Sequence, residues 1–442
     1  MDILLTQVPQ LILCLALLIV LHEMGHFFPA RWFKVRVEKF YLFFDPWFSL
    51  WKKKKGDTEY GIGWLPLGGY VKLSGMVDES MDKAQMAKPP ESWEFRSKPA
   101  WQRLIIMIGG VVVNLVLGLF IYSMVMFVWG RETLPFANMT YGIHPSELMV
   151  EYGFRDGDIL VRGEGAEGNT IDKLNRALLL GDCRTIVVLR DGQEVSITLP
   201  AEVDQGMLKN VEEPLFVPRV PFHIDSILPD GNAAKSTLRK NDRIVAVAGE
   251  PAPFFNDFQS LAKKNKGKEV VLAVLRDSSE ITVPVLISDE GKIGVASREV
   301  GKLLTIEKEK FGLLASFPAG VEHGIGVLTG QARSMKLLGT KEGAKQVGGF
   351  WSILRLFGEW GDWQRFWSVT AMISIILAFM NILPIPALDG GHVMFLLYEM
   401  VARKPAPQRV MEVAQTVGMV LLLGLLLFAN GNDVFKGLTG KF

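Results

Sequence analysis

The chain has little cysteine, little histidine and almost no net charge. Only two cysteines occur among 442 residues, Cys14 in an apolar run and Cys183 in a polar region, which argues against a disulfide framework. The 48 basic and 47 acidic residues leave a net charge of +1, so there is no global basic signature for nucleic-acid binding. Hydrophobic residues make up 49% of the chain and charged residues 21%, a composition that favours a membrane protein.

Four long apolar runs are present, at about residues 8–28, 104–129, 366–401 (with interruptions) and 410–429. Each reaches the roughly 20 residues that a helix needs to cross a bilayer. The first run has no basic region before it and no small-residue cleavage pattern after it. We therefore expect it to be retained as a transmembrane helix and not removed as a signal peptide.

Basic residues beside these runs predict the orientation of the chain. Asp2 is the only charge before the first run, whereas several basic residues follow it, including Lys52 to Lys55. Arg403, Lys404 and Arg409 lie between the third and fourth runs. Both loops are therefore expected on the cytoplasmic side, with both termini and the long insert between the second and third runs on the extracytoplasmic side.

The insert contains an internal repeat. Two segments of a first copy recur in a second: GFRDGDILVRGEG (153–165) and VVLRDGQEVSITL (187–199) match LRKNDRIVAVAGE (238–250) and AVLRDSSEITVPV (273–285). Asp158 corresponds to Asp242, and Arg190 to Arg276. The pattern predicts a turn, a strand, a helix and a β-hairpin in each copy. It resembles PDZ domains, which add a peptide strand to a sheet edge. Because no carboxylate-binding loop is obvious, a spacer or steric cover is an equal alternative.

A metal-site motif, His22-Glu23-Met24-Gly25-His26, ends the first apolar run. On a helix, residues i and i+4 share a face, so both imidazoles can bind one zinc ion while Glu23 reaches a water on it. Zinc lowers the pKa of that water, and the carboxylate takes its proton. A chance match is the alternative. However, ionisable residues are costly in an apolar span, and two of only six histidines fall in this motif.

A catalytic zinc ion needs a third protein ligand and keeps one position for water. The best candidate is Asp389 in the segment NILPIPALDGG, residues 381–391, whose prolines and glycines break the third apolar run. Irregular backbone at membrane depth is tolerated where it is buried in protein or lines a cavity. His392 is a rival ligand. Asn381 is either a helix-packing residue or a donor to the oxyanion that forms during peptide hydrolysis.

Together, HEMGH, NILPIPALDGG and the PDZ-like insert resemble the bacterial site-2 protease family, RseP type, over nearly the whole chain. The second span, IGGVVVNLVLG with Asn114, is also similar to the family's pattern. The resemblance implies zinc (Zn2+) held by His22, His26 and Asp389, with Glu23 as the general base. It also implies that Asn381 holds the substrate or stabilises the intermediate.

The family has a membrane-associated β-hairpin loop that pairs with the substrate, and the stretch YGIGWLPLGGYVKL, residues 60–73, matches it. The resemblance therefore implies substrate contacts at the residues Tyr60, Gly61, Ile62, Gly63, Gly68 and Gly69. An ordinary interfacial hairpin is the alternative. Where many members carry a glycine-rich "GFG" segment, this chain has YLFFDPW, residues 41–47.

The expected protein is thus a multi-pass α-helical membrane protein with four transmembrane helices, two extracytoplasmic PDZ-like α+β domains and a membrane-associated β-hairpin loop. The expected segments are 1–130 (two spans and the loop), 131–210 and 211–300 (PDZ-like domains), 301–362 (an interfacial region) and 363–442 (two spans). The resemblance implies the bacterial inner membrane, with the PDZ domains and both termini on the periplasmic side.

The resemblance also implies that the partners are the lipid bilayer and single-pass membrane substrates, such as an anti-sigma factor after a first cleavage, or signal-peptide remnants. The PDZ pair could bind peptide ligands. A different function is a non-catalytic PDZ membrane adaptor with a structural metal site, but a pseudoenzyme has no reason to retain Glu23. A metal transporter is disfavoured because no inverted repeat of spans is seen.

Overall fold

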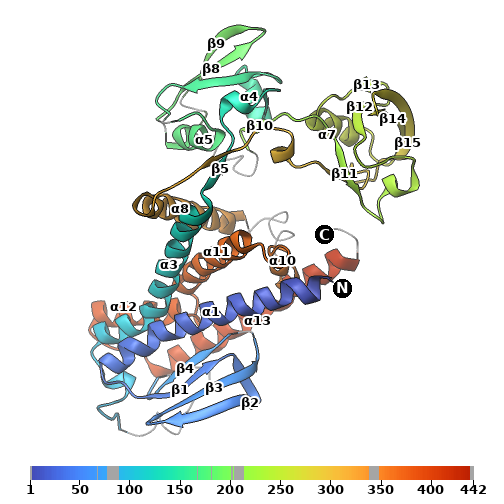
Figure 1. Ribbon diagram of the computed structural model, residues 1–442. Helices are drawn as coiled ribbons and strands as arrows, with labels where there is room; N and C mark the ends of the chain where they lie inside the picture. Colours follow the sequence, from blue (N-terminus) through green and yellow to red (C-terminus); the bar gives the residue numbers. More distant parts are fainter. Residues whose placement is uncertain are drawn as a thin grey trace. The chain divides into compact units, whose positions relative to one another are not determined.

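The computed structural model describes residues 2–66, 68–76, 89–166, 168–180, 182–200, 203, 214–337 and 348–438 (Figure 1). The chain divides into two compact units. The first combines Met1–Gly130 with Lys310–Phe442, and the second is Arg131–Glu309. The long insert of the sequence is therefore a separate unit, and the two halves of the helical unit come from the two ends of the chain.

The first unit is mainly helical. Its helices are α1 (Asp2–Trp32), α3 (Ala100–Trp129), α8 (Leu313–Leu337), α10 (Phe350–Leu354), α11 (Trp363–Ile382), α12 (Asp389–Ala402) and α13 (Gln408–Leu438). Among the described residues, four segments are long and apolar enough to cross a membrane: Thr6–Trp32, Ala100–Trp129, Trp363–Ile382 and Gln408–Gly437. The third apolar run is divided between α11 and α12, because the prolines of the intervening turn cannot continue a helix.

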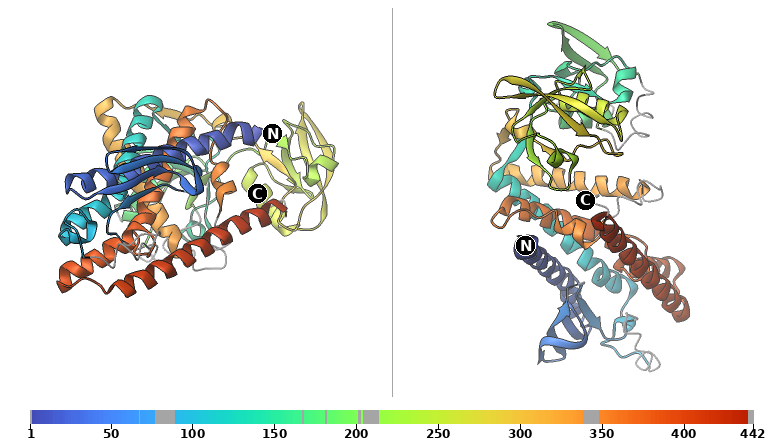
Figure 2. Two further views of the ribbon diagram at one scale, coloured as in Figure 1. Left: turned by 90° about the horizontal axis from the view of Figure 1, so that it is seen from below. Right: turned by 90° about the vertical axis from the view of Figure 1, so that its right-hand side faces the viewer.

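Helix α3 lies at the centre of this unit and contacts α1, α8, α11 and α12. Small residues make these contacts close: Gly25 of α1 lies against Gly109, and Gly320 of α8 lies against Ser123. Such residues let helix backbones approach within a membrane. Helix α13 is the least buried of the four candidate spans and runs along the side of the helical unit in both views of Figure 2.

A four-stranded sheet follows α1. Its strands are β1 (Val37–Leu42), β2 (Phe44–Lys55), β3 (Thr58–Leu65) and β4 (Tyr70–Leu73), in the order β2-β3-β1-β4. Strand β1 pairs with β3 in parallel and with β4 in antiparallel fashion, and both β1 and β4 contact α1. The hairpin in this region joins β2 to β3 and does not lie within residues 60–73, because the stretch 44–55 is itself extended and pairs with β3.

The second unit contains two sheet-rich modules, each with its own hydrophobic core. The first core includes Phe154 and Phe216, and the second includes Phe222 and Phe258. The first module holds β5 (Arg131–Thr133), β6 (Ile143–Pro145), α4 (Glu147–Glu151), β7 (Ile159–Gly163), α5 (Ile171–Leu180), β8 (Thr185–Arg190), β9 (Gln193–Thr198) and β10 (Phe216–Pro218). Because β10 pairs with β6, this module extends past residue 210.

The second module holds β11 (Ile224–Ile227), β12 (Arg243–Val247), β13 (Glu250–Pro251), α7 (Phe255–Lys264), β14 (Glu269–Arg276), β15 (Ser279–Leu286) and β16 (Val295–Ser297). Strand β17 (Glu307–Glu309) then pairs with β5. The unit therefore begins and ends on one two-stranded ladder.

The residues that the repeat matches make the same contact in both modules. Arg190 donates to the buried Asp158 through Nε (2.8 Å) and Nη2 (2.7 Å). Arg276 donates to the buried Asp242 in the same way, at 2.7 Å and 2.6 Å. Burial alone would raise the pKa of the Asp242 carboxyl, but the hydrogen bonds from Arg276 and from a backbone amide hold that pKa below its usual range. The two copies thus share an internal bidentate ion pair as well as a sequence pattern.

Candidate metal site and catalytic cavity

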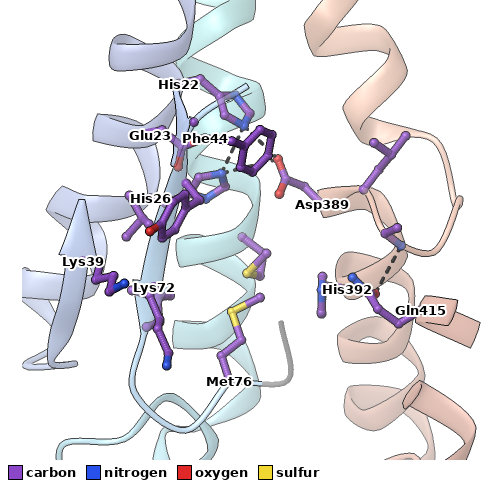
Figure 3. A pocket seen from close by; sticks show the side chains of 17 residues that line it. His22, Glu23, His26, Lys39, Phe44, Lys72, Met76, Asp389, His392 and Gln415 are labelled. Atoms are coloured by element: carbon purple, nitrogen blue, oxygen red, sulfur yellow. Dashed lines mark hydrogen bonds and ion pairs between the residues drawn. The ribbon is translucent and has the colours of Figure 1, made fainter. Parts of the chain in front are cut away.

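Three donor atoms from two distant parts of the chain converge beside α3 (Figure 3). His22 and His26 lie one turn apart on α1, and Asp389 is the first residue of α12. Oδ2 of Asp389 is 3.2 Å from Nε2 of His22 and 3.4 Å from Nε2 of His26. The two Nε2 atoms are 3.3 Å apart.

These separations fit a tetrahedral zinc ion. Bonds of about 2.0–2.1 Å to nitrogen and oxygen in tetrahedral geometry put neighbouring ligand atoms about 3.3–3.4 Å apart. Oδ2 of Asp389 is buried, faces two imidazoles and accepts no hydrogen bond from the described residues. A carboxylate oxygen in that position is stabilised by a cation between it and the two rings. Three protein donors also leave the fourth position that a catalytic zinc site keeps for water.

Helix α3 orients the ring of His26. Nδ1 of this histidine lies 2.8 Å from the carbonyl oxygen of Ile106, which can only accept a hydrogen bond. Nδ1 therefore carries the proton, and the lone pair of Nε2 points toward Asp389. A second hydrogen bond of this kind is a common feature of histidines that bind metals.

Glycines allow the two imidazoles to lie directly against α3. A Cβ at Gly110 would lie 2.5 Å from Nε2 of His26 and 2.6 Å from Cε1 of His22. One turn of α1 is equally constrained, because a Cβ at Gly25 would meet the backbone of Gly109 and Gly110. The glycine inside the HEMGH motif and the glycine pair of α3 are therefore needed for the same helix crossing.

Replacing Gly110 with alanine should reduce zinc affinity by roughly 10- to 100-fold, the range found when groups that orient metal ligands are changed. The added methyl group would push both rings away from Asp389. Zinc affinity of the purified full-length protein, measured by competition with a chelator, tests this expectation. Gly424→Ala on α13 is the matched control, since a Cβ there meets nothing within 4 Å. Equal affinities for the two variants would contradict the steric argument.

Asp389 is positioned by a turn that α12 and α13 both contact. A Cβ at Gly390 would meet the carbonyl of Leu383, and the amide of Ala387 donates to Oε1 of the buried Gln415 at 3.2 Å. Ala387 adopts a positive φ of 76°, which is unfavourable for a residue with a Cβ. The two glycines after Asp389 thus permit the tight packing that holds its carboxylate toward α1.

A cavity of about 450 Å³ adjoins the three donors. Glu23, which is 8% exposed, lines it together with His22, His26 and Asp389. The other lining residues come from the sheet and from the second half of the chain: Lys39, Phe44, Gly69, Tyr70, Val71, Lys72, Leu73, Met76, Met107, Ala387, Leu388, His392 and Gln415. The Glu23 carboxylate, the three converging donors and the edge strand β4 therefore share one space (Figure 3).

Not all of the predicted substrate-contacting residues are among the described residues that line this cavity. Tyr60 to Gly63 lie in β3, between β1 and β2, and are not among the described residues that line it. Gly68 lies against the ring of Phe44, whereas Gly69 lines the cavity and lies beside Ile19 and Glu23. Asn381 is half-buried in the last turn of α11, and it too is outside the described lining.

His392, the rival ligand, lines the cavity but is not in the group of three converging donors. The sequence motifs do not single out Phe44 or Gln415. Tyr70–Leu73 is the end of the predicted loop stretch 60–73, and this end lines the cavity. A signal existed for Gln415, because it is a polar residue inside an apolar run. Phe44 lies in the YLFFDPW segment, and the importance of that segment could not be read from its composition.

The chain is similar to known proteins over almost its whole length. The model of the family described as Peptidase family M50 matches residues 10–425. A "Putative zinc metalloprotease" of Vibrio cholerae is 27% identical over 452 residues, covering 96% of this chain and 97% of the relative. "Protease RseP" of Yersinia pestis is 29% identical (94% and 96% covered), and "Regulator of sigma-E protease RseP" of Escherichia coli is 28% identical (94% and 96% covered).

Proposed function

The chain belongs to peptidase family M50 and is an intramembrane zinc metalloprotease of the site-2 type, and from this premise we propose the roles of its residues. His22, His26 and Asp389 hold the zinc ion, and Glu23 is the general base. The observation that carries this assignment is the mutual separation of the three donor atoms, 3.2 to 3.4 Å, beside a cavity that Glu23 also lines.

When bound, zinc acts as a Lewis acid that polarises the scissile carbonyl and lowers the pKa of a water bound to it. Glu23 takes the proton of the attacking water and passes it to the departing amine nitrogen. Its buried position beside Gly69 keeps the carboxylate close to the substrate backbone. Asn381 is proposed to donate to the oxyanion or to hold the substrate, since it lies in the last turn of the helix that leads into the Asp389 turn.

Strand β4 is the proposed docking edge for the substrate. A helical peptide hides its carbonyls in internal hydrogen bonds, so the segment to be cut must unwind. Strand β4 pairs with β1 on one side, forms the edge of its sheet and lines the cavity. An extended segment added to this edge would run past Glu23 and Asp389. Of the proposed contacts, Tyr60, Gly61, Ile62 and Gly63 then belong to a supporting strand. Gly68 packs against Phe44, and Gly69 lines the cavity directly.

Disulfide cross-linking distinguishes the two strands. In a Glu23→Gln background, which should retain uncut substrate, Val71→Cys on β4 should cross-link to a single cysteine near the scissile bond. Ile62→Cys on β3 is the matched control, because Ile62 is an aliphatic strand residue outside the described cavity lining. Efficient cross-linking at position 62 with none at 71 would instead favour direct contact with β3.

We propose single-pass membrane proteins as substrates, namely an anti-sigma factor after a first cleavage or signal-peptide remnants. The name of the Escherichia coli relative, a regulator of sigma-E protease, supports the first class. The basic residues near the span ends support an inner-membrane topology with both termini and the second unit on the periplasmic side. The two sheet-rich modules are proposed to be PDZ domains that select or exclude substrates by size or by peptide binding.

A further inference from the structure

We propose that Asn114 is a positioning residue that fixes the tautomer of His22, an inference that rests on the proposed role of His22 as a ligand. Asn114 lies in the middle of α3 and is only 1% exposed. Its side-chain Nδ2 is 3.2 Å from Nδ1 of His22, on the opposite side of the ring from the atom that faces Asp389, and its Oδ1 has no hydrogen-bond partner among the described residues. The amide therefore determines which ring nitrogen carries the proton.

The direction of this hydrogen bond follows from what His22 must do. If the amide nitrogen donated to Nδ1, the ring proton would lie on Nε2, and a protonated Nε2 has no lone pair for a cation. Half a turn of the amide exchanges its oxygen and nitrogen, which are nearly equal in size and shape. Oδ1 then accepts from Nδ1–H, and the lone pair of Nε2 faces His26 and Asp389. Asn114 therefore acts as an acceptor.

Both proposed histidine ligands are then oriented in the same way by one helix. The carbonyl of Ile106 accepts from Nδ1 of His26. With the amide turned, Oδ1 of Asn114 accepts from Nδ1 of His22, the ring atom that the Asn114 amide faces. The two acceptors differ in one respect: substitution of Ile106 leaves its backbone carbonyl in place, whereas substitution of Asn114 removes its side-chain amide. The orientation of His22 is thus the part of the metal site that depends on a single replaceable side chain.

Helix packing alone does not explain the asparagine. The polar contact between α3 and α11 at this level is made by the backbone of Asn114, whose carbonyl accepts from Oγ of Ser374 at 2.7 Å. That bond would persist with any side chain at position 114. An amide buried in an apolar span is costly, so its side chain needs a separate reason, and the contact with His22 supplies one.

Chelator competition on the purified full-length protein tests the proposal with three variants. Asn114→Leu keeps the shape and removes the acceptor, so zinc affinity should fall by roughly 10- to 100-fold. In Asn114→Asp, the ionised carboxylate can accept a hydrogen bond but cannot donate one. This variant should therefore bind zinc at least as tightly as the wild type. Ser374→Ala removes the interhelical hydrogen bond without touching His22 and should leave zinc affinity unchanged.

Two outcomes would overturn the proposal. One is wild-type zinc affinity in a folded Asn114→Leu protein. The other is weakened binding in Asn114→Asp, which decides the matter even where the leucine variant does not fold, because an acceptor at position 114 would then not support zinc binding. His22→Ala separates this proposal from the assignment on which it rests. If that variant keeps zinc, the ligand role of His22 fails; if it loses zinc while Asn114→Leu does not, only the role of Asn114 fails.

Discussion

Replacing Glu23 with glutamine should abolish peptide-bond hydrolysis while zinc stays bound. Glutamine has almost the same shape as glutamate, so the cavity and the three donor atoms are undisturbed. Its amide cannot take a proton from water, and loss of a general base typically costs about 10²- to 10⁴-fold in rate. Cleavage of a model single-pass substrate by the purified protein, with zinc measured in the same sample, gives both quantities.

The two measurements distinguish the protease from the adaptor. Retained zinc with lost cleavage is the expected result. Unchanged cleavage in Glu23→Gln would remove this residue from the mechanism, and a wild-type protein without zinc or cleavage would favour a non-catalytic adaptor. Glu399→Gln is a suitable control carboxylate, because it lies on α12 and pairs with Arg103 outside the catalytic cavity.

Replacing Asp389 with asparagine should release zinc and abolish cleavage together. The substitution removes the negative charge that lies 3.2 and 3.4 Å from the two imidazole nitrogens. Because a ligand is lost, the fall in zinc affinity should exceed the 10- to 100-fold that changes outside the ligand set produce. Chelator competition and substrate cleavage, measured on the same purified variant, test this expectation.

His392→Gln is the control for Asp389, since this residue lines the same cavity from the same helix and was the rival ligand. It should keep zinc, because its ring is not in the group of converging donors. Loss of zinc in His392→Gln, with zinc retained in Asp389→Asn, would reverse the assignment. Folding of both variants should be checked by hydrogen exchange in α1 and α3, because these helices surround the site. Limited proteolysis of the second unit would not detect a local change there.

The HEMGH motif was readable from the sequence because its geometry is local. Helical periodicity alone places His22 and His26 on one face, one turn apart. Asp389 was readable for a different reason, since a carboxylate in an apolar region needs a compensating partner. The four candidate spans followed from length and hydropathy, and their number agrees with the long apolar helices in the part of the chain that the structure describes.

The arrangement of the sheet was not readable in this way. Strand β1 pairs in parallel with β3 and in antiparallel fashion with β4, so the strand that lines the cavity is selected by pairings between separated segments. Strands pair through backbone N–H and C=O groups, which every residue except proline carries, and the letters of the stretch 60–73 therefore do not specify which part of it forms the edge. Phe44 lines the cavity for the same reason, through the position of its strand.

The sequence by itself determined the kind of chemistry: a zinc-binding motif, a distant carboxylate and enough apolar helices to put both in a membrane. Only the tertiary structure decided which residues surround that chemistry, including Gly110, Ile106, Asn114 and Gln415. The physical reason is that a motif depends on spacing along one helix, whereas these contacts depend on how closely α1, α12 and α13 approach one another and α3. That approach is set by packing among residues far apart in the chain, and no single segment encodes it.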